Sequence, residues 1–268
     1  MFNTTIATQI YAKICFEATN SQKKIIENLS EYLSDDDFSR IFVLNGFAGT
    51  GKTTLIAALV AALKELRIKP VLLAPTGRAA KVLARYCGEQ ALTIHKRIYR
   101  QRTNADYESK FSLDFNREQG AVFIVDEASM LSDSTGDGAL FGSGSLLEDL
   151  VSYVRSGRGC RLILVGDSAQ LPPVGCDFSP ALDPATVSRY GEVVYGLMDE
   201  VVRQQMQSGI LFNATLVRCM LENRIYEIPK FEMDYPDFES VEGGDFMEKL
   251  QDAFDRYGRD EGIVITRS

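Results

Sequence analysis

The chain has 268 residues, of which 45% are apolar, and its formal net charge at pH 7 is −8. This composition supplies enough apolar residues for a buried core in one large or two smaller domains, and it excludes a disordered or fibrous protein. The N-terminus lacks the basic start and apolar stretch of a secretion signal, and no run reaches the roughly 18 apolar residues of a membrane span, so we expect a cytoplasmic protein.

Short apolar runs alternate with helical stretches along much of the chain, an order typical of an α/β fold with a parallel sheet. The apolar runs predict strands at 41–45, 70–74, 121–125 and 161–165. Stretches rich in good helix formers predict helices at 21–33, 53–67, 77–87 and 145–155. We expect these elements to form a first domain over residues 1–189.

A second unit is expected over residues 190–268. It begins with the apolar run E-V-V-Y-G-L-M and continues with predicted helices at 208–222 and 244–257 and a terminal strand, I-V-I-T, at 263–266. A lone strand leaves no room for the rest of a sheet. The second unit is therefore predicted to be incomplete.

Residues 46–53 read G-F-A-G-T-G-K-T, a complete phosphate loop placed between a predicted strand and a predicted helix. Glycines allow successive backbone N–H groups to point into one concavity, and the start of the helix adds its positive dipole end. We expect Lys52 to reach the β- and γ-phosphates of ATP and Thr53 to hold magnesium. The expected nucleotide ligands in this segment are Gly46, Ala48, Gly49, Thr50, Gly51, Lys52, Thr53 and Thr54.

The predicted strand at 121–125 delivers two adjacent carboxylates, Asp126 and Glu127, at its carboxyl end, where open α/β sheets bind ligands. Asp126 can hold magnesium, and Glu127 can accept a proton from the water that attacks the γ-phosphate. The alternative is that Asp126 caps a helix and Glu127 is an acid of its first turn.

Charge is segregated along the chain. Residues 78–102 hold seven basic side chains and one acidic, whereas residues 221–262 hold thirteen acidic and five basic. A polyanion feels the local potential within a Debye length of about 8 to 10 Å. The basic segment can therefore engage phosphates despite the acidic total, and a solvated helix face is the alternative.

A third motif, L-V-G-D-S-A-Q-L-P-P-V-G, occupies residues 164–175. Together with A-P-T-G-R-A-A-K-V-L at 74–83, D-E-A-S at 126–129 and V-V-R-Q at 201–204, it resembles superfamily 1 DNA helicases, nearest the RecD-like members of subclass B. The four motifs have the order and approximate spacing of that family. The resemblance implies a RecA-like P-loop NTPase domain with a parallel sheet flanked by helices, a small β-hairpin insertion, and the start of a second RecA-like domain.

The resemblance also implies roles for single residues. Gln170 resembles the family's γ-phosphate sensor, and Arg203 resembles the arginine that reaches the same phosphate from the second motor domain. With Lys52 and Glu127 they form the expected catalytic set. Gln22 resembles the upstream glutamine that reads adenine. The alternative for Gln22 is a plain glutamine on a helix surface. The alternative for Arg203 is a helix-capping or salt-bridged arginine.

Four further residues correspond to segments of the family that contact single-stranded DNA. Thr76, Gly77 and Arg78 offer a hydroxyl, a backbone amide and a guanidinium, all natural phosphate ligands. His95, the only histidine, matches another segment on the DNA side. A structural histidine is the alternative.

Residues 97–118 show two roughly alternating stretches separated by Thr103-Asn104-Ala105-Asp106, which predicts a β-hairpin. Members of the family place here a small hairpin that helps to split the duplex. Tyr99, Tyr107 and Phe111 could supply a stacking tip. Cross-strand packing pairs are the alternative.

The later motifs of the family's second motor domain are not found, so we expect the front portion of a helicase. The function implied is a motor core that hydrolyses Mg-ATP, binds single-stranded DNA and moves 5′ to 3′, with weak or no turnover by this chain alone. Two alternatives stay open. One is a nucleotide-regulated P-loop module that binds a protein partner through the acidic segment 221–262, and the other is an RNA-directed motor.

Overall fold

The computed structural model describes residues 2–14, 17–103, 109–133, 141–202, 208–259 and 261–266. It divides into two compact units, Met1–Arg203 and Gln204–Ser268, called unit 1 and unit 2 below. Each unit is described by itself.

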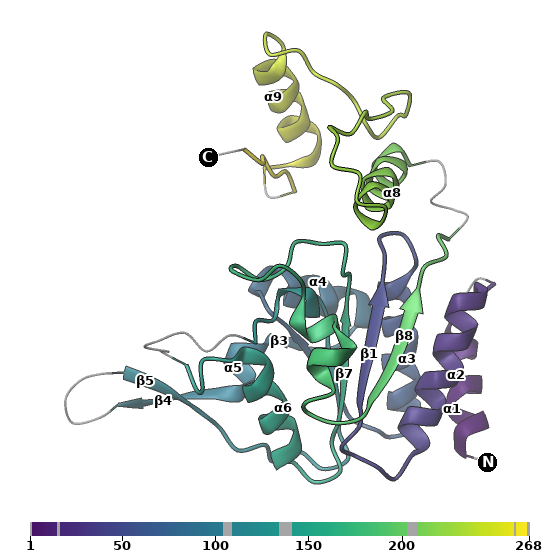
Figure 1. The fold of residues 1–268 in the computed structure, drawn as a ribbon, viewed down its shortest axis with the longest axis vertical. Helices are drawn as coiled ribbons and strands as arrows, with labels where there is room; N and C mark the ends of the chain where they lie inside the picture. The colour runs from purple at the N-terminus through teal and green to yellow at the C-terminus, as the bar shows by residue number, and fades with distance from the viewer. Residues whose placement is uncertain are drawn as a thin grey trace. The chain divides into compact units, whose positions relative to one another are not determined.

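Unit 1 is built on a six-stranded parallel sheet with the order β3-β2-β6-β7-β1-β8 (Figure 1). Four of these strands are the predicted ones, and the α/β fold class is confirmed. Apolar residues fill β1, β6 and β7 without alternation because both faces of a parallel sheet are covered. The strands are β1 (Ile41–Gly46), β2 (Pro70–Ala74), β3 (Ala91–Thr93), β6 (Val122–Val125), β7 (Arg161–Gly166) and β8 (Val193–Met198).

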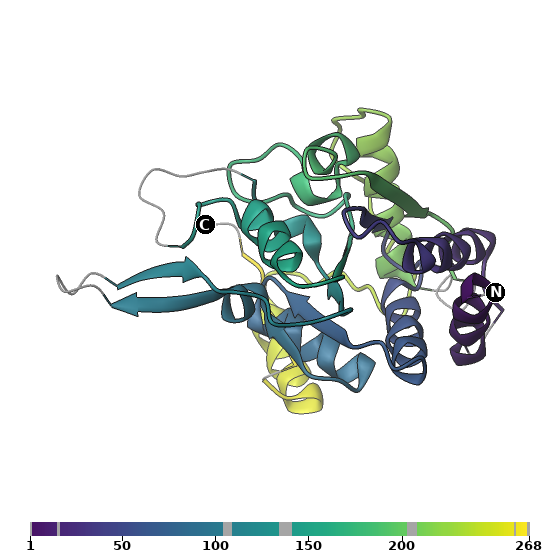
Figure 2. The same cartoon turned by 90° about the horizontal axis from the view of Figure 1, so that it is seen from below.

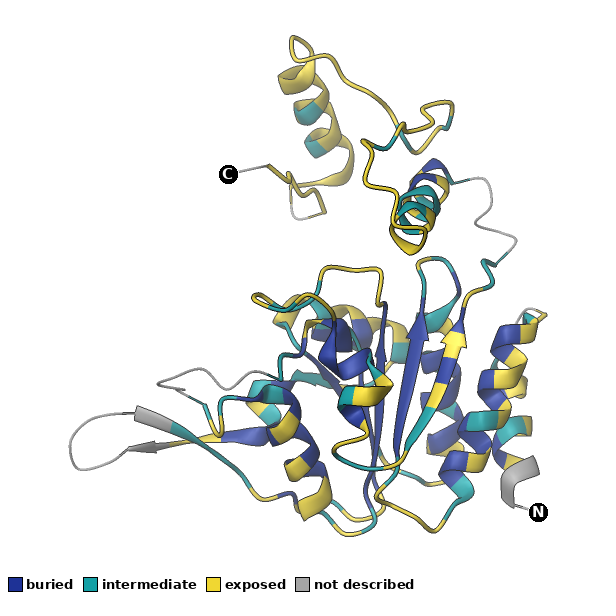
Figure 3. Ribbon diagram, viewed as in Figure 1, coloured by how far each residue is buried: buried dark blue, intermediate teal, exposed yellow. Residues whose placement is uncertain are grey.

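Helices cover both faces of the sheet. Successive residues of a strand point to opposite faces, so Phe42 and Leu44 join one apolar cluster while Ile41 and Val43 join the other. The first cluster includes α1 (Phe2–Lys13), α2 (Asn20–Ser34), α3 (Lys52–Glu65) and α4 (Gly77–Cys87). The second includes α5 (Ile94–Ile98), α6 (Leu146–Ser156), α7 (Pro184–Val187) and the short 3₁₀ helices η1 (Ala128–Met130) and η2 (Pro180–Leu182). Figure 3 shows the resulting core as a dark blue band along the central strands.

The first unit extends beyond the boundary expected at residue 189. β8, expected to open the second unit, pairs in parallel with β1 and forms the edge of the first sheet, and the division falls after Arg203. The apolar run of β8 pairs with the side of β1 that β7 does not occupy. β8 remains partly open to solvent, since Tyr195 and Leu197 are exposed.

The predicted hairpin is confirmed as β4 (Tyr99–Thr103) and β5 (Ser109–Leu113), which pair in antiparallel fashion with Gln101 opposite Phe111. It projects away from the sheet (Figure 2). Residues 104–108, including Tyr107, lie outside the described part of the chain.

Unit 2 contains α8 (Gly209–Glu222) and α9 (Phe246–Tyr257), both of which the sequence predicts. The Asp237 carboxylate accepts hydrogen bonds from the Gly209 N–H (2.7 Å) and the Ser208 hydroxyl (2.6 Å) at the start of α8. The prediction of a terminal strand was wrong, because residues 263–266 have irregular backbone. Within the described residues of unit 2 there is no strand for them to join.

Among the described residues, no helix is both long enough and apolar enough to cross a membrane.

Candidate nucleotide-hydrolysis site

The predicted motifs meet at the carboxyl ends of the strands of the sheet, called the strand-end edge, or the edge, below. Because β1, β2, β6 and β7 are parallel and in register, their carboxyl ends lie side by side. The phosphate loop leaves β1, the segment A-P-T-G-R leaves β2, the two carboxylates follow β6, and the third motif continues β7. The edge is therefore where nucleotide chemistry is expected.

Two glycines give the phosphate loop its shape. Gly51 precedes α3 with φ 85°, in the left-handed region that favours glycine, and a Cβ there would lie 2.8 Å from Nε2 of Gln22. A Cβ on Gly46 would lie 2.9 Å from the Lys52 side chain, so this glycine lets Lys52 lie across the end of β1. The loop residues Ala48, Gly49 and Thr50 lie between them.

The side chain of Lys52 is drawn into the loop and toward a cluster of carboxylates. Its Nζ donates to the backbone carbonyls of Gly46 and Phe47 (3.0 Å for the latter) and lies 3.7 Å from Oδ2 of Asp167. Burial lowers the pKa of Lys52, and the charges of Asp167, Glu127 and Asp126 oppose this shift. Thr53 and Thr54 follow Lys52 in the first turn of α3.

Asp167 is a site residue that sequence reasoning missed. It is buried, and its side chain carries the ion pair with Lys52. Its residue type and its place in the motif at 164–175 were visible in the sequence, but the distance to Lys52 depends on the pairing of β1 with β7. Asp167 also shapes its own turn, since its Oδ1 accepts from the Ala169 N–H (2.9 Å) and its carbonyl from the Gln170 N–H (3.1 Å).

Asp126 and Glu127 are buried enough to change their acidity. Burial raises the pKa of Asp126, and burial with the nearby Asp126 charge raises the pKa of Glu127. Glu127 has φ 54°, unusual for a residue with a side chain, and its N–H donates to Oδ1 of Asp126 (3.0 Å). The capping alternative finds no support, because Glu127 itself occupies the N-cap position of η1 and makes no side-chain cap bond.

Gln170 faces the carboxylates and the residues expected to contact DNA. A cavity of about 340 Å³ is lined by Gln170, Asp126, Glu127, Thr76 and Arg78, together with three apolar neighbours. The Ser129 hydroxyl donates to Oε1 of Gln170 at 3.5 Å. Residues from three separate motifs thus share one cavity.

Gln22 is fully engaged with the protein. It is buried, its Nε2 donates to the Thr50 carbonyl (2.9 Å), and its Oε1 accepts from the Thr19 N–H (3.0 Å) as part of a capping box at the start of α2. The structure therefore places Gln22 against the phosphate loop, where it braces the backbone. The expected role in reading adenine stays a prediction.

The segment after β8 also contacts the phosphate loop. The Phe47 N–H donates to the Met198 carbonyl (3.1 Å), and the Val202 N–H donates to the Gly49 carbonyl (3.0 Å). Arg203, the next residue and a predicted catalytic arginine, lies outside the described residues.

The residues expected to bind DNA fall in two places. Thr76 caps α4, accepting from the Ala79 N–H (3.2 Å), and Gly77 and Arg78 are exposed in the first turn. His95 is not among the residues that line the cavity. It lies in α5 against the aromatic rings at the base of the hairpin.

The base of the hairpin is an aromatic cluster. The His95 ring lies 5.7 Å from that of Tyr99 and 5.1 Å from that of Phe141, which stacks on Phe111 at 4.5 Å. Burial lowers the pKa of His95. The Tyr99 hydroxyl donates to the buried Asp149 carboxylate (2.6 Å), which ties β4 to α6. Tyr99 and Phe111 therefore pack at the base rather than at the tip.

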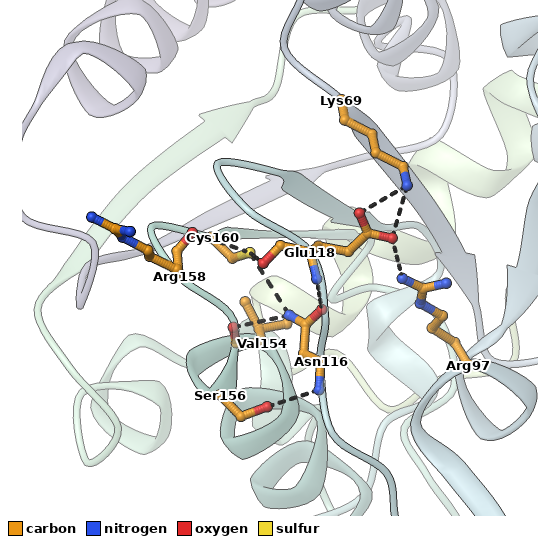
Figure 4. A network of polar contacts seen from close by, with 8 residues as sticks. All are labelled: Lys69, Arg97, Asn116, Glu118, Val154, Ser156, Arg158 and Cys160. Atoms are coloured by element: carbon orange, nitrogen blue, oxygen red, sulfur yellow. Dashed lines mark hydrogen bonds and ion pairs between the residues drawn. The ribbon is translucent and has the colours of Figure 1, made fainter.

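A polar network holds the chain on both sides of the hairpin (Figure 4). Glu118 accepts from Arg97 (2.6 Å) and from Lys69 (2.8 Å). Asn116 donates through Nδ2 to the Val154 carbonyl (3.2 Å) and through its N–H to the hydroxyl of Ser156 (3.1 Å). The hairpin is thus anchored to unit 1 by packing and by hydrogen bonds.

The sequence profile of a family described as an AAA domain matches residues 17–212, so the chain belongs to this family. A protein of Deinococcus radiodurans, described as an ATP-dependent RecD2 DNA helicase, is 30% identical over 154 residues, which is 58% of this chain and 19% of that protein. The RecD subunit of the RecBCD enzyme of Mycobacterium tuberculosis is 33% identical over 201 residues, covering 61% of this chain and 32% of the subunit. The expected resemblance to RecD-like superfamily 1 helicases is confirmed.

A solved structure supports the fold. The Pif1 helicase from Bacteroides, in complex with ADP-AlF3 and single-stranded DNA, has a TM-score of 0.50 and 18% identity, over 92% of this chain and 58% of that one. This likeness is one of fold. The chain spans less than a third of the length of the RecD-like relatives it matches.

Proposed function

We propose that this chain is the ATP-hydrolysing motor core of a DNA helicase, in which hydrolysis of Mg-ATP is coupled to a bound single strand and to movement in the 5′ to 3′ direction. One observation carries the proposal. The carboxylates Asp126 and Glu127 share a cavity with Thr76 and Arg78, and Gln170 lines the same cavity. A single strand of DNA bound at the first turn of α4 would contact the same cavity as the hydrolytic groups.

Each group of the site has a role in this proposal. Lys52 would exchange the carbonyls of Gly46 and Phe47 for phosphate oxygens, because a cation binds anionic oxygens more strongly than neutral carbonyls. Glu127 would take the proton of the attacking water, and its raised pKa makes it a stronger base than an exposed glutamate. Gln170 and Arg203 would contact the γ-phosphate.

The donor set at the edge fits magnesium. Thr53 offers a hydroxyl and Asp126 a carboxylate, and magnesium commonly binds one or two carboxylates together with nucleotide phosphates. Among the described residues, no group of three or more histidine, cysteine or acidic side chains is suited to a metal. A magnesium ion that is also bound by nucleotide phosphates does not require such a group. The ion would neutralise charge on the β- and γ-phosphates when bound.

The exposed face of α4 supports nucleic-acid binding. Arg78, Lys81 and Arg85 recur at the spacing of one helix face, are exposed, and have no ion-pair partner in the described part of the chain. By contrast, Arg97 and Arg100 of the same basic segment pair with Glu118 and Asp114. Most of the free charge of this segment is therefore on α4, which continues from the proposed DNA contacts at its first turn, and Lys96 of α5 is a further exposed cation without an ion-pair partner among the described residues.

Unit 2 is proposed to be the opening of a second RecA-like domain. The support is its place in the chain, directly after the V-V-R-Q motif.

The experiment that tests the proposal is ATP hydrolysis by the full natural gene product without nucleic acid and with single-stranded DNA, duplex DNA or RNA. We expect the largest stimulation from single-stranded DNA, with Lys52→Ala as the background. Nucleotide binding that depends on Lys52 but ignores every polynucleotide would favour the partner-binding module. Preferential stimulation by RNA would favour an RNA-directed motor. Polarity would be read from unwinding of duplexes with a 5′ or a 3′ single-stranded tail.

A further inference from the structure

Asn45, the residue of β1 before Gly46, uses its whole amide to join β1 to the turn after β7 and to Tyr195 in the middle of β8. Its Nδ2 donates to the hydroxyls of Ser168 (2.8 Å) and Tyr195 (3.1 Å), and its Oδ1 accepts from the Ser168 N–H (3.0 Å). β1 lies between β7 and β8 in the sheet, so a side chain at its end can reach both neighbours. Asn45 is buried, whereas both partners are exposed.

The turn that Asn45 holds carries two groups of the candidate site. Ser168 stands between Asp167, which pairs with Lys52, and Gln170, which lines the cavity with Glu127. The turn is closed by its own bonds from the N–H groups of Ala169 and Gln170 to Asp167. Two of the three Asn45 bonds therefore fix the turn relative to the strand that leads into the phosphate loop.

An asparagine suits this position for a specific reason. Two donors and one acceptor are needed within one short side chain, and serine, threonine and aspartate do not provide them. Because the group is buried, an unmade bond here would cost more than it would at the surface. The arrangement is thus specific in both chemistry and geometry.

We propose that Asn45 is a positioning residue that holds the Asp167–Gln170 turn in register with the phosphate loop, so that Gln170 meets the γ-phosphate. Asn45 acts through Ser168 and does not itself contact nucleotide. The inference rests on the proposed function, because the role of Gln170 at the phosphate is part of it.

The test compares the binding of ADP alone with that of ADP plus aluminium fluoride, a mimic of the transferring phosphate, by calorimetry. Ser168→Ala removes a hydroxyl that accepts from Asn45 on the turn. Tyr195→Phe removes a hydroxyl that accepts from the same nitrogen on the β8 side. Loss of one hydrogen bond corresponds to about a fivefold change in an equilibrium constant. We expect Ser168→Ala to weaken binding of the mimic about fivefold and to change ADP affinity less than twofold.

The matched variants separate positioning from general support. Tyr195→Phe should change neither affinity more than about twofold, since it leaves both bonds to the turn intact, and Ser168→Thr should restore binding of the mimic because it keeps the hydroxyl. Equal weakening of ADP and the mimic by Ser168→Ala, or equal effects of Ser168→Ala and Tyr195→Phe, would overturn the inference.

An Asn45→Ala variant extends the test if it folds. Its effect and that of Ser168→Ala should combine to less than their product, because both variants break the same bond. If the effects of the two variants on binding of the mimic multiply, as independent changes do, the assignment of a hydrogen bond shared by Asn45 and Ser168 is contradicted. Wild-type protein that binds the mimic no better than ADP, or binds both equally well after Lys52→Ala, would overturn the proposed function itself and the inference with it.

Discussion

The two units differ in how completely their elements bury apolar side chains. In unit 1 every residue of β1, β6 and β7 is buried, and apolar clusters fill both faces of the sheet. In unit 2 no residue of α9 is buried, and Tyr226 and Ile228 are 85% and 91% exposed. Stabilisation from apolar burial grows with the area removed from water. The candidate site therefore lies on the part of the chain that has an apolar core of its own.

Replacing one apolar side chain in each unit tests this contrast most strongly. Phe123 is fully buried in β6, so Phe123→Ala should lower the free energy of unfolding by about 3 to 5 kcal/mol. Ile228→Ala in unit 2 should change it by no more than about 0.5 kcal/mol. Denaturant unfolding followed by circular dichroism measures both. Similar losses from the two variants would show that unit 2 contributes to the core.

Within unit 1, the strand-end edge and the outer face of α4 contrast in a second way, because Lys52 is paired with Asp167 at the edge, whereas Lys81 and Arg85 of α4 are exposed and have no ion-pair partner among the described residues. Lys52→Ala removes the cation at the centre of the edge, and ATP hydrolysis should fall at least about a hundredfold, as expected when an electrostatic contact to the transition state is lost. The protein should still melt cooperatively, since Lys52 belongs to neither apolar cluster, but its melting temperature should fall because the buried Asp167 carboxylate loses its cation.

Lys23→Ala is the control for Lys52→Ala. Lys23 is exposed on α2 and has no ion-pair partner within the described residues, so hydrolysis should be unaffected. A Lys52→Ala protein that aggregates or loses its cooperative melting transition would contradict the assignment of Lys52 to phosphate binding.

The edge was predictable from sequence because its residues belong to buried strands and to turns with special chemistry. Apart from Asn45 and Arg161 at their ends, the strands at 41–45, 121–125 and 161–165 are continuous apolar runs, which a parallel sheet covered on both faces requires. The phosphate loop is recognisable in the sequence by its glycines, because Gly49 and Gly51 have positive φ, which glycine adopts most readily. Local patterns of this kind are independent of the rest of the fold.

Other features depend on contacts between distant parts of the chain. α1 was not predicted, although Ile6 and Ile10 lie one turn apart and are fully buried. β3 has three residues, too few for a pattern, and β8 was assigned to the wrong unit because only its pairing with β1 identifies its sheet. The roles of Asp167 and Asn45 likewise arise from neighbours more than 100 residues away.

The half-buried carboxylates Asp126 and Glu127 predict a pH dependence of hydrolysis. Glu127 must be deprotonated to accept a proton, and burial together with the Asp126 charge raises its pKa above the ordinary value of 4.5. Activity should therefore be full above the raised pKa and lost as the pH falls through it, so the acid limb of the rate profile should have its midpoint above 4.5. Circular dichroism at each pH would confirm that the protein remains folded. A midpoint at or below 4.5 would count against Glu127 as the base.

The free charges of α4 predict the smallest and most specific effect. Each phosphate contact to a single strand contributes about 0.7 to the slope of log affinity against log salt concentration, because a counterion is released. Lys81→Gln and Arg85→Gln should each reduce the steepness of this slope for single-stranded DNA by about 0.7. Fluorescence anisotropy of a labelled oligonucleotide over a range of salt concentrations measures it.

Two matched variants decide whether the α4 effect is local. Lys23→Gln removes an equally exposed cation from α2, which belongs to the β8 side of the sheet, and should leave the slope unchanged. Lys69→Gln removes a cation already paired with Glu118 and should also have little effect. If all four variants reduce the slope alike, DNA responds only to the net charge of the chain. A reduction confined to Lys81 and Arg85 would instead place the strand along α4, next to the cavity that contains Glu127.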